Sequence, residues 1–253
     1  MRGNDLHRAA DTTDGPVGRR ISWDACVNVR DLGGLAARGG KVRPHRFVRA
    51  SAFGTLSADG AQAMREFGVR TVIDLRWPEE MEARPSHFAT GVRYVNIPVD
   101  RPREIDLYEA LTTGTMREVV GSIAAPGSGV RDAIMTIAEA EPAVLVHCTA
   151  GLDRTGLIVA LTLAAIDVQE DEIVADYCLS DAELEPEYRR LLSTEPDRYP
   201  SLPDRIRRRE EMMRGLLTAV RGDYGNAASF LTAVGVSGMI VERLREALIE
   251  SQS

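Results

Sequence analysis

Cysteine and histidine are scarce in this sequence. Its 253 residues include four histidines and three cysteines, which are Cys26, Cys148 and Cys178. An odd and sparse set of cysteines is not a disulfide framework, and the histidines show none of the spacings found in zinc sites. The sequence therefore predicts free thiols in a reducing compartment, and it indicates neither a metal nor an organic cofactor.

Long apolar runs and a surplus of positive charge are also missing. No stretch approaches the roughly 20 apolar residues of a membrane span, and residues 1–20 lack the apolar core of a signal peptide. The formal net charge of -7 argues against general binding to nucleic acids or membrane surfaces, which requires a basic field. We expect a cytoplasmic protein that binds no nucleic acid and does not insert stably into membranes. Secretion by a route without a signal peptide stays open, and the sequence does not indicate an oligomeric state.

What is present suits one folded domain. The chain is 44% hydrophobic and 27% charged, which is ordinary for a globular protein with a sizeable core. We expect residues 1–20 to form a flexible tail and residues 21–253 to form a single domain.

Strand and helix signals alternate along the first part of the chain. Apolar or alternating patterns predict strands at 46–50, 69–75, 92–99 and 143–146. Helices are expected at 57–67, 130–140 and 154–166, and residues 103–121 carry mixed helical signals of a candidate mobile cover. Later helices are expected at about 169–180, 181–193, 204–221, 223–234 and 237–250. We predict an α/β fold, with a central, mostly parallel sheet flanked by helices and a helical C-terminal portion.

The segment from His147 to Gly156 has the pattern of a phosphate-binding loop. It follows a short apolar strand, opens a helix and contains Gly151, which tolerates unusual backbone angles. Such a loop can turn its N–H groups inward in front of a helix N-terminus and hold an anion. The residues expected to bind phosphate are Thr149, Ala150, Gly151, Leu152, Asp153 and Arg154.

Cys148 lies where the floor of that loop is expected. A lone cysteine after an apolar strand is usually a small buried apolar residue. Here the arginine six residues later, the glycine between them and the following helix favour a reactive thiolate. The thiolate would attack phosphorus in line and form a cysteinyl-phosphate, with Arg154 and the loop amides stabilising the charge that develops. Cys26 and Cys178 lack such neighbours and are expected to be structural.

His-Cys-x5-Arg-Thr resembles the signature of the protein tyrosine phosphatase superfamily, with the Thr-Ala-Gly-x-Asp filling of bacterial atypical tyrosine and dual-specificity phosphatases. Similar motifs of that family occur at 28–34, 72–76, 173–177 and 231–248, so the resemblance covers nearly the whole chain. It implies a phosphatase domain of protein tyrosine phosphatase-like fold. The implied substrate is a phosphotyrosine protein or peptide, with phosphoserine and phosphothreonine as further candidates.

The resemblance also implies catalytic roles. Cys148 is the expected nucleophile, and Arg154 is expected to bind the phosphate and its transition state. Asp153 is the expected general acid, which would later act as the base that hydrolyses the phosphocysteine. Asp74 is a second candidate acid, and Asp100 is a third.

Supporting roles are expected for three residues near the loop. Asp74 is interpreted mainly as a partner of Arg154 or Arg76 that orients the loop. Thr155 is expected to donate a hydrogen bond to the thiolate. His147 is expected to brace the loop rather than transfer protons.

Leu152 departs from the family pattern, which often has lysine between the glycine and the aspartate. In relatives that lysine is associated with binding additional phosphates, as on phosphoinositides. A leucine at the mouth would instead offer an apolar contact to a phosphotyrosine ring, although a phosphoinositide substrate remains the alternative.

Two alternative functions and one charged cluster remain to be considered. A catalytically inactive phosphate-binding module and a sulfurtransferase are weaker interpretations, because the chain keeps the cysteine, the arginine and the helix start that suits bound phosphate. An arginine cluster is interpreted as a solvated helix face or as a rim contact for an anionic substrate; it comprises Arg205, Arg207, Arg208 and Arg209.

Overall fold

The computed structural model describes residues 19–86, 91–99 and 106–251 of the chain. Asp100, the third candidate acid, lies outside the described residues. Arg19 and Arg20 belonged to the expected tail, but both are tied to the domain. The Arg19 guanidinium donates to Asp176 at 2.9 Å, and Arg20 forms a β-bridge with Arg30.

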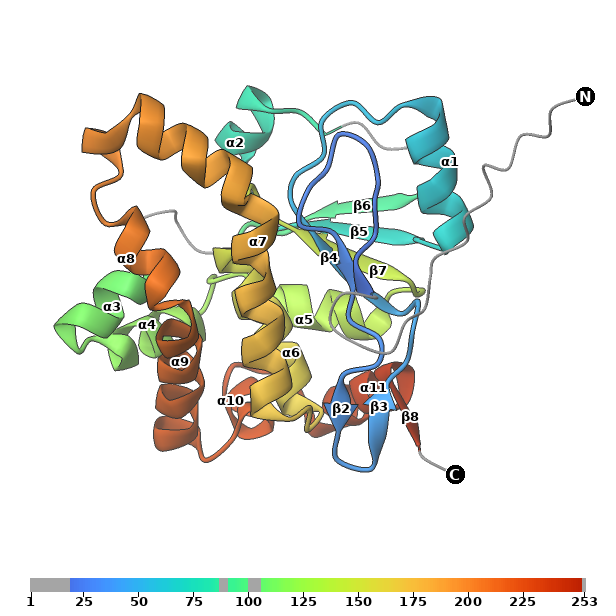
Figure 1. Cartoon of the computed structure of the whole chain (residues 1–253). Coiled ribbons are helices and arrows are strands. Elements are labelled where there is room, and N and C mark those ends of the chain that lie inside the picture. Colours follow the sequence, from blue (N-terminus) through green and yellow to red (C-terminus); the bar gives the residue numbers. More distant parts are fainter. Residues whose placement is uncertain (1–18, 87–90, 100–105, 252–253) are drawn as a thin grey trace, which may run out of the picture.

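A five-stranded sheet forms the centre of the molecule (Figure 1). Its order is β1-β4-β7-β5-β6, and its strands are β1 (Arg30–Asp31), β4 (Phe47–Ala50), β7 (Val144–His147), β5 (Thr71–Asp74) and β6 (Arg93–Asn96). The last four run parallel to one another, and β1 pairs with β4 in the antiparallel direction at one edge. The mostly parallel sheet confirms the predicted fold class, and each predicted strand is found; β1 was not predicted.

The two faces of the sheet bury different side chains. Val72 and Leu145 belong to a smaller apolar cluster that includes Met64 of α1 (Ala58–Phe67). Their neighbours Ile73 and Val146 belong to the main core on the opposite face. This alternation follows from the two-residue period of a strand, and it explains why β5 and β7 carry apolar residues on both faces.

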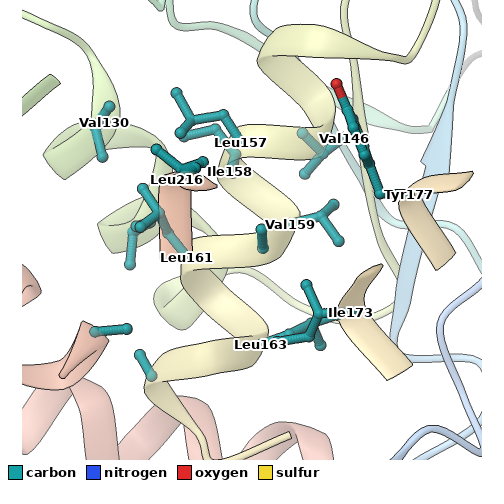
Figure 2. Close-up of a cluster of buried hydrophobic side chains, with 14 of the residues drawn as sticks. Val130, Val146, Leu157, Ile158, Val159, Leu161, Leu163, Ile173, Tyr177 and Leu216 are labelled. Carbon is teal, nitrogen blue, oxygen red and sulfur yellow. The ribbon is translucent and has the colours of Figure 1, made fainter. Parts of the chain in front are cut away.

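Helices build the main core on the second face. They are α5 (Val130–Glu139), α6 (Asp153–Ala165), α7 (Glu170–Thr194), α9 (Arg209–Tyr224), α10 (Ala227–Ala233) and α11 (Gly238–Leu248). In the centre lies α6, which is buried almost all round. Figure 2 shows it between Ile173 and Tyr177 of α7 on one side and Leu216 of α9 on the other. Each such buried side chain contributes about 1.5–3 kcal/mol relative to exposure, so α6 is a rigid base for the loop that precedes it.

The boundaries of α7 correct the expectation of two helices at 169–180 and 181–193. The chain continues through Ser180 and Asp181 as one helix. Both side chains make tertiary contacts from within it: the Ser180 hydroxyl accepts from Arg30, and the Asp181 carboxylate accepts from Arg209. Polar residues that find partners in this way do not end a helix.

Two other helical segments also differ from expectation. The predicted helix at 204–221 is broken at Arg208, whose N–H bonds back to Asp204, and it forms α8 (Leu202–Arg207) and α9. The predicted helix at 223–234 begins only at Ala227. Gly225, with φ of 82°, ends α9, and the Asn226 side chain caps α10.

Residues 103–121 were expected to be helical and a candidate cover. Their described part forms α3 (Leu107–Thr113) and continues into α4 (Met116–Ala124), with a break at Gly114, whose φ is 76°. Both helices pack against α9.

One helix and a second small sheet were not expected. The helix α2 (Pro78–Ala83) begins at Pro78, a position where proline is favoured. A second small sheet has the order β2-β3-β8, from β2 (Ala36–Ala37), β3 (Gly40–Val42) and β8 (Ile249–Ser251). Because β8 pairs with β3, the C-terminal segment is joined to the N-terminal part of the domain.

Candidate active site

The candidate site lies where three parallel strands end together. Register places both Ala50 of β4 and Asp74 of β5 opposite His147 of β7. Residues that follow these strands therefore meet at one edge of the sheet, as the carboxyl ends of parallel strands do. The phosphate-loop sequence leaves β7 at that edge and enters α6.

The backbone of residues 148–152 forms a tight loop. Gly151 has φ of 68°, and a Cβ atom there would lie 2.3 Å from the Ala50 carbonyl oxygen, so only glycine fits. The N–H groups of Ala150, Gly151 and Leu152 donate to no described residue. Leu152, the N-cap of α6, has no side-chain oxygen to cap the helix. The loop can therefore offer these donors, with the helix N-terminus behind them, to an anion.

Cys148 occupies the first position of the loop and is 3% exposed. Arg154, in the first turn of α6, has a side chain that is 12% exposed. Burial disfavours its charge, but the Glu80 hydrogen bonds and the nearby Cys148 raise the pKa of Arg154 above its ordinary value. A permanent guanidinium therefore lies within electrostatic range of the thiol.

Glu80 of α2 is the partner of Arg154, and the sequence did not reveal it. Nη1 and Nη2 of Arg154 donate to the two carboxylate oxygens at 2.6 and 2.7 Å. The same carboxylate accepts from the Thr149 hydroxyl at 2.8 Å and from the Trp77 N–H at 3.0 Å. Burial opposes its charge, but these donors hold the pKa of Glu80 at about 2. In the sequence, a glutamate three residues after a helix start indicates only a helix-capping residue. It does not predict an ion pair with Arg154.

Asp153 begins α6 and is open to solvent. Surrounding protein still removes much of its hydration, and this burial raises the pKa of the Asp153 carboxyl. The charges of Arg209 and Arg205 oppose the shift, while Asp106 adds to it. A raised pKa increases the fraction of the protonated acid at a given pH.

Asp74 is fully buried and saturated with donors. Its carboxylate binds the Arg76 guanidinium at 2.6 Å and accepts from the Tyr94 hydroxyl at 2.6 Å. Burial works against the charge, but Arg76 and the other donors lower the pKa of Asp74. Of the two partners expected for it, the structure gives Arg76 and not Arg154. A carboxylate held ionised in this way is a poor proton donor.

His147 is buried at the end of β7. Its Nδ1 lies 3.1 Å from the Cys148 carbonyl oxygen, and its Nε2 lies 3.6 Å from Asp74. Burial, opposed by Asp74, lowers the pKa of His147. The neutral ring is thereby linked to both the loop and the Asp74–Arg76 pair.

Two loop residues differ from expectation. The Thr155 hydroxyl does not bond to Cys148; it is enclosed by the buried first turn of α6 and has no hydrogen-bond partner among the described residues. Leu152 is only 6% exposed and belongs to the main core, so it is not an open apolar wall at the mouth.

The arginine cluster after residue 204 is divided between two environments. Arg207 and Arg208 form ion pairs with residues three positions away on the helix surface. Arg209 is 4% exposed and binds Asp181 at 3.0 Å, and Arg205 pairs with Asp106. The solvated-face interpretation therefore fits only the first two, because the charges of the other two act on Asp153 and oppose the rise in its pKa.

The other two thiols lie in environments unlike that of the loop. Burial raises the pKa of Cys26 to about 12 and that of Cys178 to about 11.

Among the described residues, no group of histidine, cysteine, aspartate and glutamate side chains could hold a metal ion. Within the same residues, no helix has the length and apolar character needed to cross a membrane.

A cavity of about 420 Å³ lies beside the loop. Thr149 lines it from the loop, and Arg84 and Pro85 line it from the segment after α2. Residues 52–55 form the rest of its wall. The cavity adjoins the phosphate-loop residues and contains one cationic side chain.

Comparisons with known proteins identify relatives of this chain. A family model described as "Tyrosine phosphatase family" matches residues 21–250. A provisionally named tyrosine-protein phosphatase of Cupriavidus necator is 33% identical over 167 residues, which are 62% of this chain and 61% of that protein. The tyrosine-protein phosphatase of Nostoc commune is 29% identical over 83% of this chain and 76% of its own length. The triple specificity protein phosphatase PtpB of Mycobacterium tuberculosis is 25% identical over 88% of this chain and 96% of its own length.

Among solved structures, TpbA of P. aeruginosa is 17% identical, with a TM-score of 0.32 over 60% of this chain and 72% of that one. Because that score is low, the fold assignment rests on the sheet topology described above. The family match covers most of the chain and includes the loop that carries Cys148 and Arg154. The chain belongs to the tyrosine phosphatase family.

Proposed function

We propose that this protein hydrolyses phosphotyrosine in proteins or peptides through a cysteinyl-phosphate intermediate. The observation that carries the proposal is the position of Cys148 at the start of a loop that leads into α6, whose N–H groups donate to no described residue and whose Arg154 interacts electrostatically with Cys148. The family membership of the protein and the names of its relatives support a phosphatase activity.

In the first step, the substrate phosphate binds to the loop N–H groups and Arg154. Glu80 holds one edge of the guanidinium, and the Nε–H, which donates to no described residue, is left for a phosphate oxygen. The Cys148 thiolate attacks phosphorus and forms the S–P bond while the P–O bond to the phenolic oxygen breaks. Asp153 gives its proton to the leaving phenolate.

In the second step, a water molecule hydrolyses the cysteinyl-phosphate. Asp153, now ionised, takes a proton from the water as its oxygen attacks phosphorus. The S–P bond breaks, the thiolate returns and inorganic phosphate leaves. The same carboxyl thus acts first as acid and then as base. The raised pKa of Asp153 and its access to solvent support this double role.

Two observations support a phosphotyrosine peptide as the substrate. Cys148 is nearly buried, so a long, slender side chain is suited to reach it. The cavity beside Thr149 can take residues that flank the phosphorylated one in a peptide, and Arg84 would favour an acidic neighbour there. One relative is named a triple specificity phosphatase, so the substrate panel extends beyond phosphotyrosine to the other classes considered from the sequence: phosphoserine, phosphothreonine and phosphoinositides.

The first experiment measures p-nitrophenyl phosphate hydrolysis in the presence of EDTA, followed by rates on the four substrate classes. We expect metal-independent turnover, fastest with phosphotyrosine peptides, and a phosphorylated Cys148 in acid-quenched samples examined by mass spectrometry. Cys148→Ser should abolish turnover and retain binding of a phosphotyrosine peptide, with Cys178→Ser as the matched control. Turnover by Cys148→Ser would refute the nucleophile. Thiosulfate turnover in place of phosphate release would identify a sulfurtransferase.

A further inference from the structure

Asp176 of α7 is a fully buried carboxylate behind the phosphate loop. It accepts from the guanidinium groups of three arginines: Arg19 and Arg30 at 2.9 Å, and Arg49 at 2.8 Å. Burial opposes its charge, but these arginines hold the pKa of Asp176 below its ordinary value. The carboxylate therefore stays ionised and fixes the orientation of the guanidinium groups around it.

Two of these arginines connect Asp176 to the loop. Arg49 donates from Nη1 to Asp176 and from Nη2 to the Gly151 carbonyl oxygen, at 2.8 and 2.7 Å. Arg30 binds the side-chain oxygen of Asn28. With its oxygen held in this way, the Asn28 amide donates to the carbonyl oxygens of both Ala150 and Gly151, each at 3.1 Å.

These contacts fix which way the loop peptides face. A peptide unit carries its C=O and N–H on opposite sides. Where the Ala150 and Gly151 carbonyls are held toward Asn28 and Arg49, the N–H groups of the following residues, Gly151 and Leu152, are turned to the opposite side. Those are donors that make no hydrogen bond to any described residue.

The charge of the cluster acts in the same direction. Three guanidinium groups surround one carboxylate, so the cluster has two more positive charges than negative ones. Burial, together with the charge of Arg30, lowers the pKa of Arg49 to about 10. This positive charge lies directly behind a loop that is to bind a dianion, where it is weakly screened because the side chains are buried.

The docking of α7 on α6 keeps Asp176 in place. A Cβ atom at Gly156 would lie 2.6 Å from the Tyr177 ring, so glycine is needed for this close approach. Figure 2 shows Tyr177 lying along α6 near its first turns. The segments at 28–34 and 173–177, which the catalytic mechanism does not use, thus meet behind the loop.

We propose that Asn28 and Arg49, oriented by Asp176, are positioning residues that hold the Ala150 and Gly151 carbonyls away from the phosphate and so aim the loop N–H groups at it. The inference rests on the proposed function, since it assigns these residues to the same phosphate site. If a carbonyl turned toward the site, a partial negative charge would replace a donor.

The test measures binding of inorganic orthovanadate by calorimetry together with kcat and KM for p-nitrophenyl phosphate. Asn28→Asp keeps the shape of the side chain but replaces the donating amide with an oxygen that repels both carbonyls. Arg49→Lys keeps the charge but cannot bridge Asp176 and Gly151 with two fixed donors. For each variant we expect vanadate affinity to fall about tenfold, the usual effect of one lost hydrogen bond to a charged site. We expect kcat to fall further than KM rises, because charge grows on the bound oxygens in the transition state.

Arg19→Lys is the matched control, because it keeps the charge of the cluster and because Arg19 binds Asp176 but has no hydrogen bond to the loop carbonyls. It should lower the melting temperature and leave vanadate affinity within about twofold of wild type, the scale of a lost contact that does not reach the ligand. If circular dichroism shows that Asn28→Asp does not fold, the result for Arg49→Lys decides whether the proposal holds.

Folded Arg49→Lys with wild-type vanadate affinity and kcat would overturn the proposal. So would an equal loss of affinity in Arg19→Lys, which would show that the effect comes from general destabilisation. A wild-type protein that binds vanadate but hydrolyses no phosphate ester would refute the proposed function and leave this test intact.

Discussion

Glu80 and Arg154 form a two-point ion pair that joins α2 to the first turn of α6, with N–O distances of 2.6 and 2.7 Å. The pair fixes the plane of the guanidinium. It also places a negative charge next to the group that is to bind a phosphate, so its effects on binding and on catalysis have opposite signs.

The Glu80→Gln variant should separate these effects. Loss of the charge removes repulsion of the phosphate, so KM for p-nitrophenyl phosphate should stay equal or fall. Loss of the two-point contact frees the guanidinium, so kcat should fall about tenfold, the scale of one charge-assisted hydrogen bond. Glu79→Gln is the control, since Glu79 is exposed and has no ion pair among the described residues. A rise in KM at constant kcat would show that Glu80 supports binding instead of orientation.

Acid should remove stability that the Glu80 carboxylate contributes. Its pKa is lowered from an ordinary 4.5 to about 2 in the folded protein. Its contribution is therefore complete above about pH 4.5 and is lost as the pH falls toward 2. Urea unfolding at pH 6, 4.5 and 3.5 should show a falling free energy of unfolding, with a smaller fall in Glu80→Gln. Identical slopes for wild type and variant would contradict the ion pair as a source of stability.

Asp153→Asn should affect leaving groups unequally. An acid that protonates the leaving oxygen matters most when that oxygen is strongly basic. We expect kcat to fall by at least about a hundredfold for phenyl phosphate, within the range of general acid catalysis, and much less for p-nitrophenyl phosphate. Burial raises the pKa of Asp153. Wild-type activity on phenyl phosphate should therefore decline as the pH rises above the ordinary range of aspartate pKa values. The pH–rate profile of the variant should not show this decline. Asp132→Asn, at an exposed site, should match wild type; equal slowing of both esters would exclude the acid role.

Alkylation should distinguish the three cysteines. At pH 7 the thiols of Cys26 and Cys178, with pKa values of about 12 and 11, contain almost no thiolate and should resist iodoacetate. Cys148, the proposed nucleophile, should be modified first, and inorganic phosphate should slow the reaction by occupying the loop. Peptide mass spectrometry over a time course measures this order. Faster labelling of Cys178 than of Cys148 would contradict the assignment.

How much the sequence predicted depends on how far apart the interacting residues are. The loop from His147 to Gly156 could be predicted because its strand, turn and helix signals are contiguous. Glu80 could not, because its partner is 74 positions away and its local signal is that of a helix cap. Asn28 and Asp176 lie in segments that resemble motifs of the family, but their link to the loop exists only after α7 packs on α6. The α7 boundary and the exposure of Leu152 were mispredicted for the same reason, since tertiary packing decides both.

Leu152→Lys tests the substrate argument that the sequence suggested. In an open loop mouth, lysine would add a charge for a second phosphate and raise phosphoinositide hydrolysis relative to phosphotyrosine. Leu152 is 6% exposed and packed in the main core, so the ammonium would be buried without a partner, which is strongly destabilising. We therefore expect a clear loss of melting temperature in Leu152→Lys, whereas Leu152→Met, which conserves volume, should cost less than about 1.5 kcal/mol. A stable lysine variant with a raised phosphoinositide-to-phosphotyrosine rate ratio would show that residue 152 reaches the substrate and would restore its role in specificity.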